Sequence, residues 1–130
     1  MLSIAFCDDE PIMLEELFNV VKGYIDSKKV EFTADLFESG EEFVEKGVRC
    51  RKYDIVFLDI EMKEMNGLEA AAWFRKLNEQ SKVIFVSSHV EYTLDAFKVA
   101  AFRYIIKNKD TMTQAVQEAL DACLDINPEI

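Results

Sequence analysis

The stretch YDIVFLDIEM, residues 53–62, places a carboxylate directly after a continuous apolar run. The run IVFL is typical of a strand that is covered on both faces of a parallel sheet, and Asp59 ends it. A second stretch has the same arrangement, because the apolar run Leu2–Cys7 is followed by Asp8 and Asp9. Two buried strands that end in acids indicate one shared site, provided that the fold brings their ends together.

Short apolar or β-branched runs recur along the chain, and each is followed by a segment with helical spacing. The runs predict strands at Leu2–Cys7, Glu31–Phe37, Ile55–Leu58, Val83–Val86 and Phe102–Ile106. Strands that alternate with helices predict a parallel sheet with helices on both faces. We therefore expect an α/β fold, a doubly wound five-stranded parallel sheet with the common strand order 2-1-3-4-5.

The expected helices carry start signals. Apolar residues at helical spacing from Leu14 to Ile25 predict the first helix, and Pro11 suits its first turn. A helix is also expected from about Glu91 to Val99. Three further helices are predicted by capping-box pairs, namely Ser39 with Glu42, Asn66 with Glu69, and Thr111 with Gln114.

The composition indicates a single cytoplasmic globular domain over residues 1–130, since half of the residues are hydrophobic and 31% are charged. No apolar stretch reaches the roughly 18 residues that a membrane-spanning helix needs, and the N-terminus lacks the basic region of a signal peptide. The three cysteines have no CxxC spacing and His89 is the only histidine, which disfavours a disulfide framework or a zinc site. A net charge of −10 disfavours direct contact with nucleic acid and suits a bound cation.

The predicted topology brings Asp8, Asp9 and Asp59 to one edge of the sheet, where the strand order reverses. Carboxylates this close repel one another, and Mg²⁺, which prefers hard oxygen ligands, would relieve the repulsion. Ser87 follows the fourth strand and Lys107 the fifth, so a hydroxyl and an ammonium group should reach the same edge. These groups suit phosphoryl transfer, with one carboxylate as the nucleophile.

Over nearly its whole length the chain resembles the receiver domains of bacterial response regulators, which act in two-component signal transduction. The resemblance rests on four motifs in order, FCDDE, DIVFLDIEMKEMNGLE, VIFVSSH and AFRYIIK. It implies a flavodoxin-like (βα)₅ fold and a phosphoprotein that a sensor histidine kinase phosphorylates. On activation such a domain would form a homodimer or regulate an output domain, and the lack of a long apolar stretch predicts no contact with membranes.

The AFRYIIK and SSHVEYTLDAF stretches are most similar to regulators with a LytTR-type DNA-binding output domain. In such a regulator that output domain would follow residue 130, and DNA would be bound only through it; a stand-alone receiver is the alternative. The expected output is therefore regulation of transcription.

By this resemblance, Asp59 is the phosphoacceptor and Lys107 pairs with the phosphate. The resemblance further implies a Mg²⁺ site made by Asp9 directly, by Asp8 largely through water, by Asp59 and by the main-chain carbonyl of Glu61.

The resemblance also assigns a switch. Ser87 would reach a phosphoryl oxygen in the activated state, and Tyr104 would turn inward when the hydroxyl follows the phosphate.

Structural alternatives exist for several of these residues. Asp8 and Asp9 could be charges that favour a helix N-terminus. Ser88 could supply the hydroxyl in place of Ser87, and Tyr104 could be an ordinary half-buried aromatic residue of the fifth strand.

Four loop residues bear on the site in other ways. Glu61 and His89, two residues beyond the nucleophile and the hydroxyl, could tune phosphate hydrolysis or be solvated loop residues. Asn108 and Lys63 stand where the family usually has proline, which predicts looser loops around the site and affects phosphate lifetime.

The leading hypothesis is a phosphorylation-activated switch that regulates its output through the fourth and fifth strand–helix units. It would catalyse its own aspartyl phosphorylation and dephosphorylation and would not be an enzyme in the conventional sense. An aspartyl-phosphate phosphatase would use Glu61 as a second acid, but DIE replaces the DxD of that class and no substrate-capping insertion is present. A phosphorylation-independent interaction module of receiver fold is the alternative that the missing prolines keep open.

Overall fold

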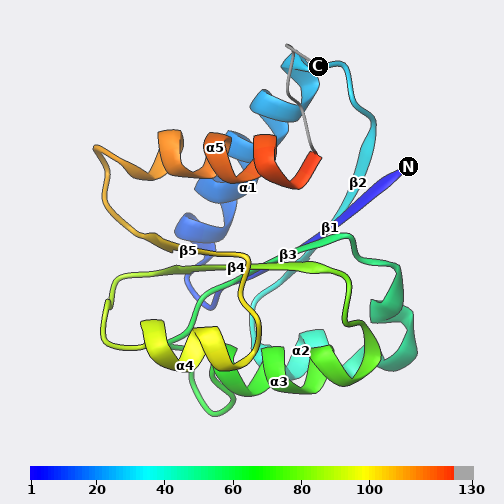
Figure 1. Ribbon diagram of the computed structural model, residues 1–130, viewed down its shortest axis with the longest axis vertical. Coiled ribbons are helices and arrows are strands. Elements are labelled where there is room, and N and C mark those ends of the chain that lie inside the picture. The colour runs from blue at the N-terminus through cyan, green and yellow to red at the C-terminus, as the bar shows by residue number, and fades with distance from the viewer. Residues whose placement is uncertain (125–130) are drawn as a thin grey trace.

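The computed structural model describes residues 1–124, in which five parallel strands form one sheet between two layers of helices (Figure 1). The strand order is β2-β1-β3-β4-β5, as predicted. Each predicted strand is present, and its bounds differ from the prediction by no more than one residue at either end. The strands are β1 Leu2–Cys7, β2 Phe32–Phe37, β3 Ile55–Leu58, β4 Lys82–Ser87 and β5 Arg103–Ile106.

Helices α1 and α5 cover one face of the sheet, and α2, α3 and α4 cover the other (Figure 1). None of the helices within residues 1–124 is both long enough and apolar enough to span a bilayer. The helices are α1 Pro11–Ser27, α2 Gly40–Glu45, α3 Gly67–Leu77, α4 Thr93–Lys98 and α5 Met112–Leu124, and a 3₁₀ helix, η1, spans Gly47–Lys52.

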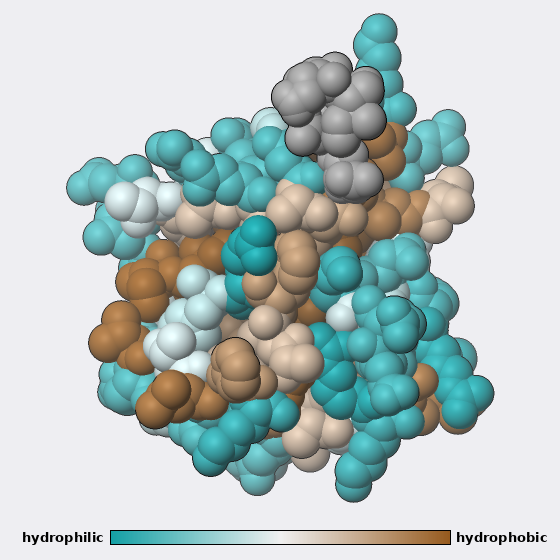
Figure 2. All heavy atoms as spheres, in the orientation of Figure 1, coloured by the Kyte–Doolittle hydropathy of each residue, from teal (hydrophilic) through white to brown (hydrophobic). Residues whose placement is uncertain are grey.

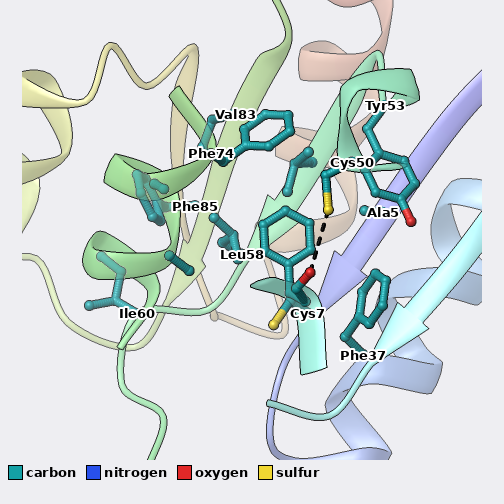
Figure 3. Packing of buried hydrophobic residues seen from close by; sticks show 14 of the residues in the cluster. Ala5, Cys7, Phe37, Cys50, Tyr53, Leu58, Ile60, Phe74, Val83 and Phe85 are labelled. Carbon is teal, nitrogen blue, oxygen red and sulfur yellow. Dashed lines mark hydrogen bonds between the residues drawn. The ribbon is translucent and has the colours of Figure 1, made fainter. Parts of the chain in front are cut away.

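Strand β3 shows why its sequence is apolar at every position. Ile55 and Phe57 pack in the cluster under α1 and α5, whereas Val56 and Leu58 pack in the cluster under α2, α3 and α4. Figure 3 shows part of the second cluster, where side chains of β1, β3 and β4 meet Phe74 of α3. A central strand that is buried on both faces anchors whatever residue follows it.

Two of the predicted helix starts have cap hydrogen bonds. Asn66 and Glu69 form the full reciprocal capping box of α3. At α2, the Ser39 hydroxyl accepts from the Glu42 main-chain N–H at 3.0 Å, but the Glu42 carboxylate accepts from the N–H of Glu38 at 2.9 Å, outside the expected box.

The remaining helices, α1, α4 and α5, are all present, but the predicted bounds of α4 are too long. Pro11 is the first residue of α1, as expected. Helix α4 is shorter than the predicted segment from Glu91 to Val99, because its first turn begins only at Thr93.

Candidate functional site

The carboxyl ends of β1 and β3 hold two buried aspartates side by side. The N–H of Asp59 donates to the carbonyl of Cys7 at 2.9 Å, and the N–H of Asp8 donates to the carbonyl of Phe37 at 3.1 Å. The sheet ladder thus continues one residue beyond each strand. Asp8 is 3% exposed and Asp59 is 5% exposed, so both carboxylates lie at the sheet edge with little contact to water.

Lys107 reaches into this acidic pair from the end of β5. Its Nζ lies 2.9 Å from Asp8 Oδ2, 3.3 Å from Asp59 Oδ2 and 3.3 Å from Glu10 Oε1. The N–H of Lys107 donates to the carbonyl of Ser87 at 2.8 Å, which sets the side chain beside β4. The peptide bond between Lys107 and Asn108 is trans, and the ammonium group still enters the acidic cluster.

The charges of the cluster shift two pKa values. Burial, and then the negative charge of Asp8, raise the pKa of Asp59 to about 7, although Lys107 opposes the shift. Burial lowers the pKa of Lys107, but the hydrogen bond to Asp8 and the charges of Asp59 and Asp8 outweigh burial and raise it overall. The raised pKa of Lys107 favours its charged form, whereas the raised pKa of Asp59 disfavours its charged form.

The donor set fits a hard divalent cation such as Mg²⁺. One carboxylate oxygen each of Asp8, Glu10 and Asp59 lies within 4.8 Å of the others, and a single ammonium group cannot neutralise three carboxylates. Asp9 lines the hollow over this cluster together with Asp59 and Lys107, and its carboxylate accepts from the N–H of Lys63 at 3.2 Å. Glu10, which was not predicted, takes the place beside Lys107.

The predicted switch residues meet at the main chain of His89. Ser87 is fully buried and its Oγ accepts from the N–H of His89 at 3.1 Å. The Tyr104 hydroxyl donates to the carbonyl of His89, and its ring packs against Phe85 at 6.2 Å between centroids. Ser88 is exposed and, with Asp59 and Lys107, lines a hollow of about 360 Å³ over the acidic cluster.

A network that sequence reasoning missed joins the two loops above this hollow. Glu61 Oε1 lies 2.8 Å from His89 Nε2, and Tyr92 donates its hydroxyl to Glu61 Oε2 at 2.9 Å. His89 Nδ1 also lies 3.3 Å from Glu91 Oε2. The residues come from the loops after β3 and β4, so only their placement in the fold identifies the network. Tyr92 had no distinguishing signal in the sequence.

Gly67 lets the chain fold back against the site. A Cβ at position 67 would lie 2.0 Å from the carbonyl oxygen of Asp59, and the N–H of Gly67 donates to the carbonyl of Ile60 at 2.9 Å. The start of α3 therefore packs directly on the backbone that carries the Asp59 carboxylate.

Known proteins are similar to this chain in sequence. A family model described as the response regulator receiver domain matches residues 4–117. The transcriptional regulatory protein LytR of Staphylococcus aureus (strain N315) is 31% identical over 103 residues, which is 77% of this chain and 39% of the relative. The sensory transduction protein LytT of Bacillus anthracis is 35% identical over 112 residues, which is 85% of this chain and 43% of the relative. The chain thus spans about two fifths of the length of these relatives.

Solved structures of response regulators are similar to this chain in fold. The response regulator TrrA of Thermotoga maritima, crystallised in complex with Mg(2+)-BeF, has a TM-score of 0.78 at 30% identity, over 95% of this chain and 99% of that one. The response regulator domain of Thermotoga maritima CheB has a TM-score of 0.72 at 29% identity, over 96% and 95% of the two chains. The relatives LytR and LytT confirm the expected likeness to receivers of LytTR-type regulators. With its sheet order, its sequence and its relatives in agreement, the chain belongs to the response regulator receiver domains of two-component systems.

Proposed function

We propose that this receiver domain is a phosphorylation-activated switch in which Asp59 accepts a phosphoryl group from a sensor histidine kinase. One observation carries the proposal. The buried Asp59 carboxylate lies 3.3 Å from Lys107 Nζ and faces a hollow that is open to solvent. Burying the Asp59 carboxylate destabilises the folded chain, and a role as nucleophile would explain why an acid occupies this position.

The chain's own residues supply the positioning. An Asp59 oxygen attacks the phosphorus atom, the bond from phosphorus to the donor nitrogen breaks, and its electron pair returns to that nitrogen. The Lys107 ammonium group lies beside the developing negative charge of the phosphoryl oxygens, and Asp8 holds Lys107 there at 2.9 Å. The Ser87 hydroxyl, which now accepts from His89, keeps its own hydrogen for a phosphoryl oxygen.

A bound Mg²⁺ would supply positive charge that neutralises the phosphoryl oxygens and the carboxylates around them. Asp8, Asp9, Asp59 and the main-chain carbonyl of Glu61 are the residues that we propose hold it. The related TrrA was crystallised in complex with Mg(2+)-BeF, and the oxygen-rich cluster in this chain suits the same ion.

The signal would travel from the site through the loop after β4. Ser87 and Tyr104 both bind the main chain of His89, so a Ser87 hydroxyl drawn to the phosphate would release the His89 N–H and let the loop whose carbonyl Tyr104 binds change position. We propose that this changes the surface of α4, β5 and α5, where the activated domain forms a homodimer or regulates its output.

The output that we propose is transcription. The relative LytR, which is named as a transcriptional regulatory protein, is longer than this chain, so a separate LytTR-type DNA-binding domain would make the DNA contact. A receiver domain is generally not a conventional enzyme, and this one would catalyse only its own phosphorylation and dephosphorylation in the cytoplasm.

The test is the intact mass of the purified chain after incubation with a small phosphodonor and Mg²⁺. One added phosphoryl group is expected, and it should be absent with EDTA and in Asp59→Asn. Asp54→Asn is the matched control, because Asp54 precedes the same strand at its other end and accepts from the N–H of Ser3. No adduct in the wild type would overturn the proposal and leave a phosphorylation-independent interaction module.

A further inference from the structure

Glu10 lies at the acidic site without a part in the proposed phosphoryl transfer. Within residues 1–124, three carboxylates contact the Lys107 ammonium group, and the contact from Glu10 Oε1, at 3.3 Å, is the one made by an exposed side chain. The Lys107 side chain is 8% exposed, and that of Glu10 is 64% exposed. A carboxylate that reaches a buried cation from solvent can also leave it.

The backbone holds Glu10 at this position. Asp8 uses Oδ2 for Lys107 at 2.9 Å, and its Oδ1 accepts from the N–H of Glu10 at 2.9 Å. Glu10 immediately precedes Pro11, the first residue of α1, and within the described residues its side chain makes no capping hydrogen bond to that helix. Its carboxylate instead contacts a residue 97 positions along the chain, so a favourable interaction with the helix N-terminus is not its only role.

The ammonium group of Lys107 has three N–H donors, and the three carboxylates can occupy all of them. A phosphoryl oxygen that binds Lys107 must therefore displace one of these acceptors. The Asp59 carboxylate would carry the phosphoryl group, so it stays in place. The Asp8 side chain is 5% exposed, and a buried carboxylate that loses its partner destabilises the fold strongly. Glu10 is therefore the acceptor that can leave.

Water can replace Lys107 as the partner of Glu10. Figure 2 shows apolar side chains gathered over α4, whereas Glu10 precedes α1, which covers the opposite face of the sheet. The exposed Glu10 carboxylate therefore meets solvent when it leaves the ammonium group, and exposed ion pairs contribute little to stability. Release of Glu10 destabilises the chain much less than release of Asp8 would.

We propose that Glu10 is a displaceable counter-ion of Lys107, which leaves the ammonium group when Asp59 carries a phosphoryl group. Glu10 acts on the site in two ways, since it competes for Lys107 and its negative charge repels the phosphoryl oxygens. Both effects weaken the binding of the phosphoryl group. Glu10 is thus a positioning residue that acts through Lys107. Its role rests on the proposed phosphorylation of Asp59 and opposes it.

The probe is beryllofluoride, an analogue of the phosphoryl group, at fixed fluoride and saturating Mg²⁺. Its dissociation constant is measured from the NMR signals of the amide groups of residues 87–89. Glu10→Gln and Glu10→Ala should each bind it about threefold to fivefold more tightly than the wild type does, because Lys107 is freed and a negative charge is lost. A purely structural role of Glu10 would predict weaker binding. In EDTA, the ¹⁵N signal of the Lys107 ammonium group should shift in Glu10→Gln.

The matched control is Glu16→Gln, which makes the same charge change at an exposed residue of α1 outside the lining of the hollow. It should alter the beryllofluoride affinity by less than about 1.5-fold and leave the Lys107 signal unchanged. Mg²⁺ alone should bind Glu10→Gln within about threefold of its affinity for the wild type. A larger loss of Mg²⁺ affinity would identify Glu10 as a metal ligand and overturn the proposal.

Two further results separate the role of Glu10 from the switch itself. Beryllofluoride binding that is equal or weaker in both Glu10 variants than in the wild type would overturn the role proposed for Glu10 and leave Asp59 as the phosphoacceptor. A wild type that binds no beryllofluoride and takes up no phosphoryl group would overturn both.

Discussion

Gly67 lies so close to the main chain of Asp59 that a Cβ at position 67 would sit 2.0 Å from the Asp59 carbonyl oxygen. Gly67→Ala must therefore move the start of α3 or the backbone that carries the Asp59 carboxylate. We expect the free energy of unfolding to fall by about 2–4 kcal/mol, as for other overpacked sites. Phosphorylation by a small phosphodonor should slow in the fraction that stays folded. Urea unfolding and intact mass measure the two effects.

Gly23 provides the matched control for this substitution. It lies in the middle of α1 with no atom within 4 Å of a Cβ position, so Gly23→Ala should raise stability by about 0.5–1 kcal/mol through helix propensity. A Gly67→Ala chain as stable as the wild type would show that the contact with Asp59 does not restrict position 67.

The acidic cluster predicts a stability that depends on pH. Burial and Asp8 raise the pKa of Asp59 to about 7. Between about pH 4 and pH 7 the folded chain then binds more protons than the unfolded chain, so the free energy of unfolding falls as the pH rises. Asp59→Asn removes the charge. We compare the free energy of unfolding of Asp59→Asn with that of the wild type in EDTA. The variant's advantage should be about 2 kcal/mol larger at about pH 8 than at about pH 4, and thermal unfolding measures it.

The control for the pH effect is Asp54→Asn, which neutralises an aspartate at the other end of β3, outside the cluster. Its stability difference from the wild type should not grow with pH as that of Asp59→Asn does. Saturating Mg²⁺ should raise the melting temperature of the wild type more than that of Asp59→Asn. A gain in Asp59→Asn that is the same at both pH values would contradict the proposed charge repulsion with Asp8.

Arg75 is predicted to hold α4 in place. Its guanidinium donates to the carbonyls of Val99 and Ala100 after α4 and of Ser81 before β4. Arg75→Met removes these donors, so we expect a loss of about 2–3 kcal/mol in the free energy of unfolding, because several carbonyls lose a charged partner. Amide hydrogen exchange of residues 99–102 should accelerate more than exchange in β1 or β3.

The neighbouring Lys76→Met is the control for Arg75, because Lys76 is exposed on the same helix and makes none of these bonds. It should change stability by less than about 0.5 kcal/mol. Uniform acceleration of exchange across the sheet in Arg75→Met would argue against a local role at α4.

The sheet was predictable because burial on both faces leaves a direct mark on the sequence. Each residue of Ile55–Leu58 packs into one of the two clusters, so no polar residue is tolerated until the strand ends at Asp59. The order of the strands then brought Asp8 and Lys107 to the same edge by topology alone. The proximity of these three side chains depends on strand ends, which local apolar patterns define well.

Features that depend on loop paths were not predictable in the same way. Glu10, which was not predicted, contacts Lys107, whereas the Asp9 carboxylate accepts from the N–H of Lys63 and lines the same hollow. The choice between adjacent acids depends on the course of a loop from another part of the chain. Arg75 likewise has no local signal, because its acceptors are main-chain carbonyls that only the folded structure brings together.

The last prediction concerns the coupling of the site to α4. The Tyr104 hydroxyl donates to the carbonyl of His89, whose N–H donates to Ser87 Oγ. Tyr104→Phe removes one hydrogen bond at a half-buried position, so stability should fall by about 1 kcal/mol and phosphorylation of Asp59 should persist. The NMR shift changes that a phosphodonor produces in residues 90–98 should shrink to about half or less, because Tyr104 no longer follows the loop. Tyr92→Phe, which loses an exposed bond to Glu61, is the matched control. Undiminished shift changes in Tyr104→Phe would remove Tyr104 from the proposed switch.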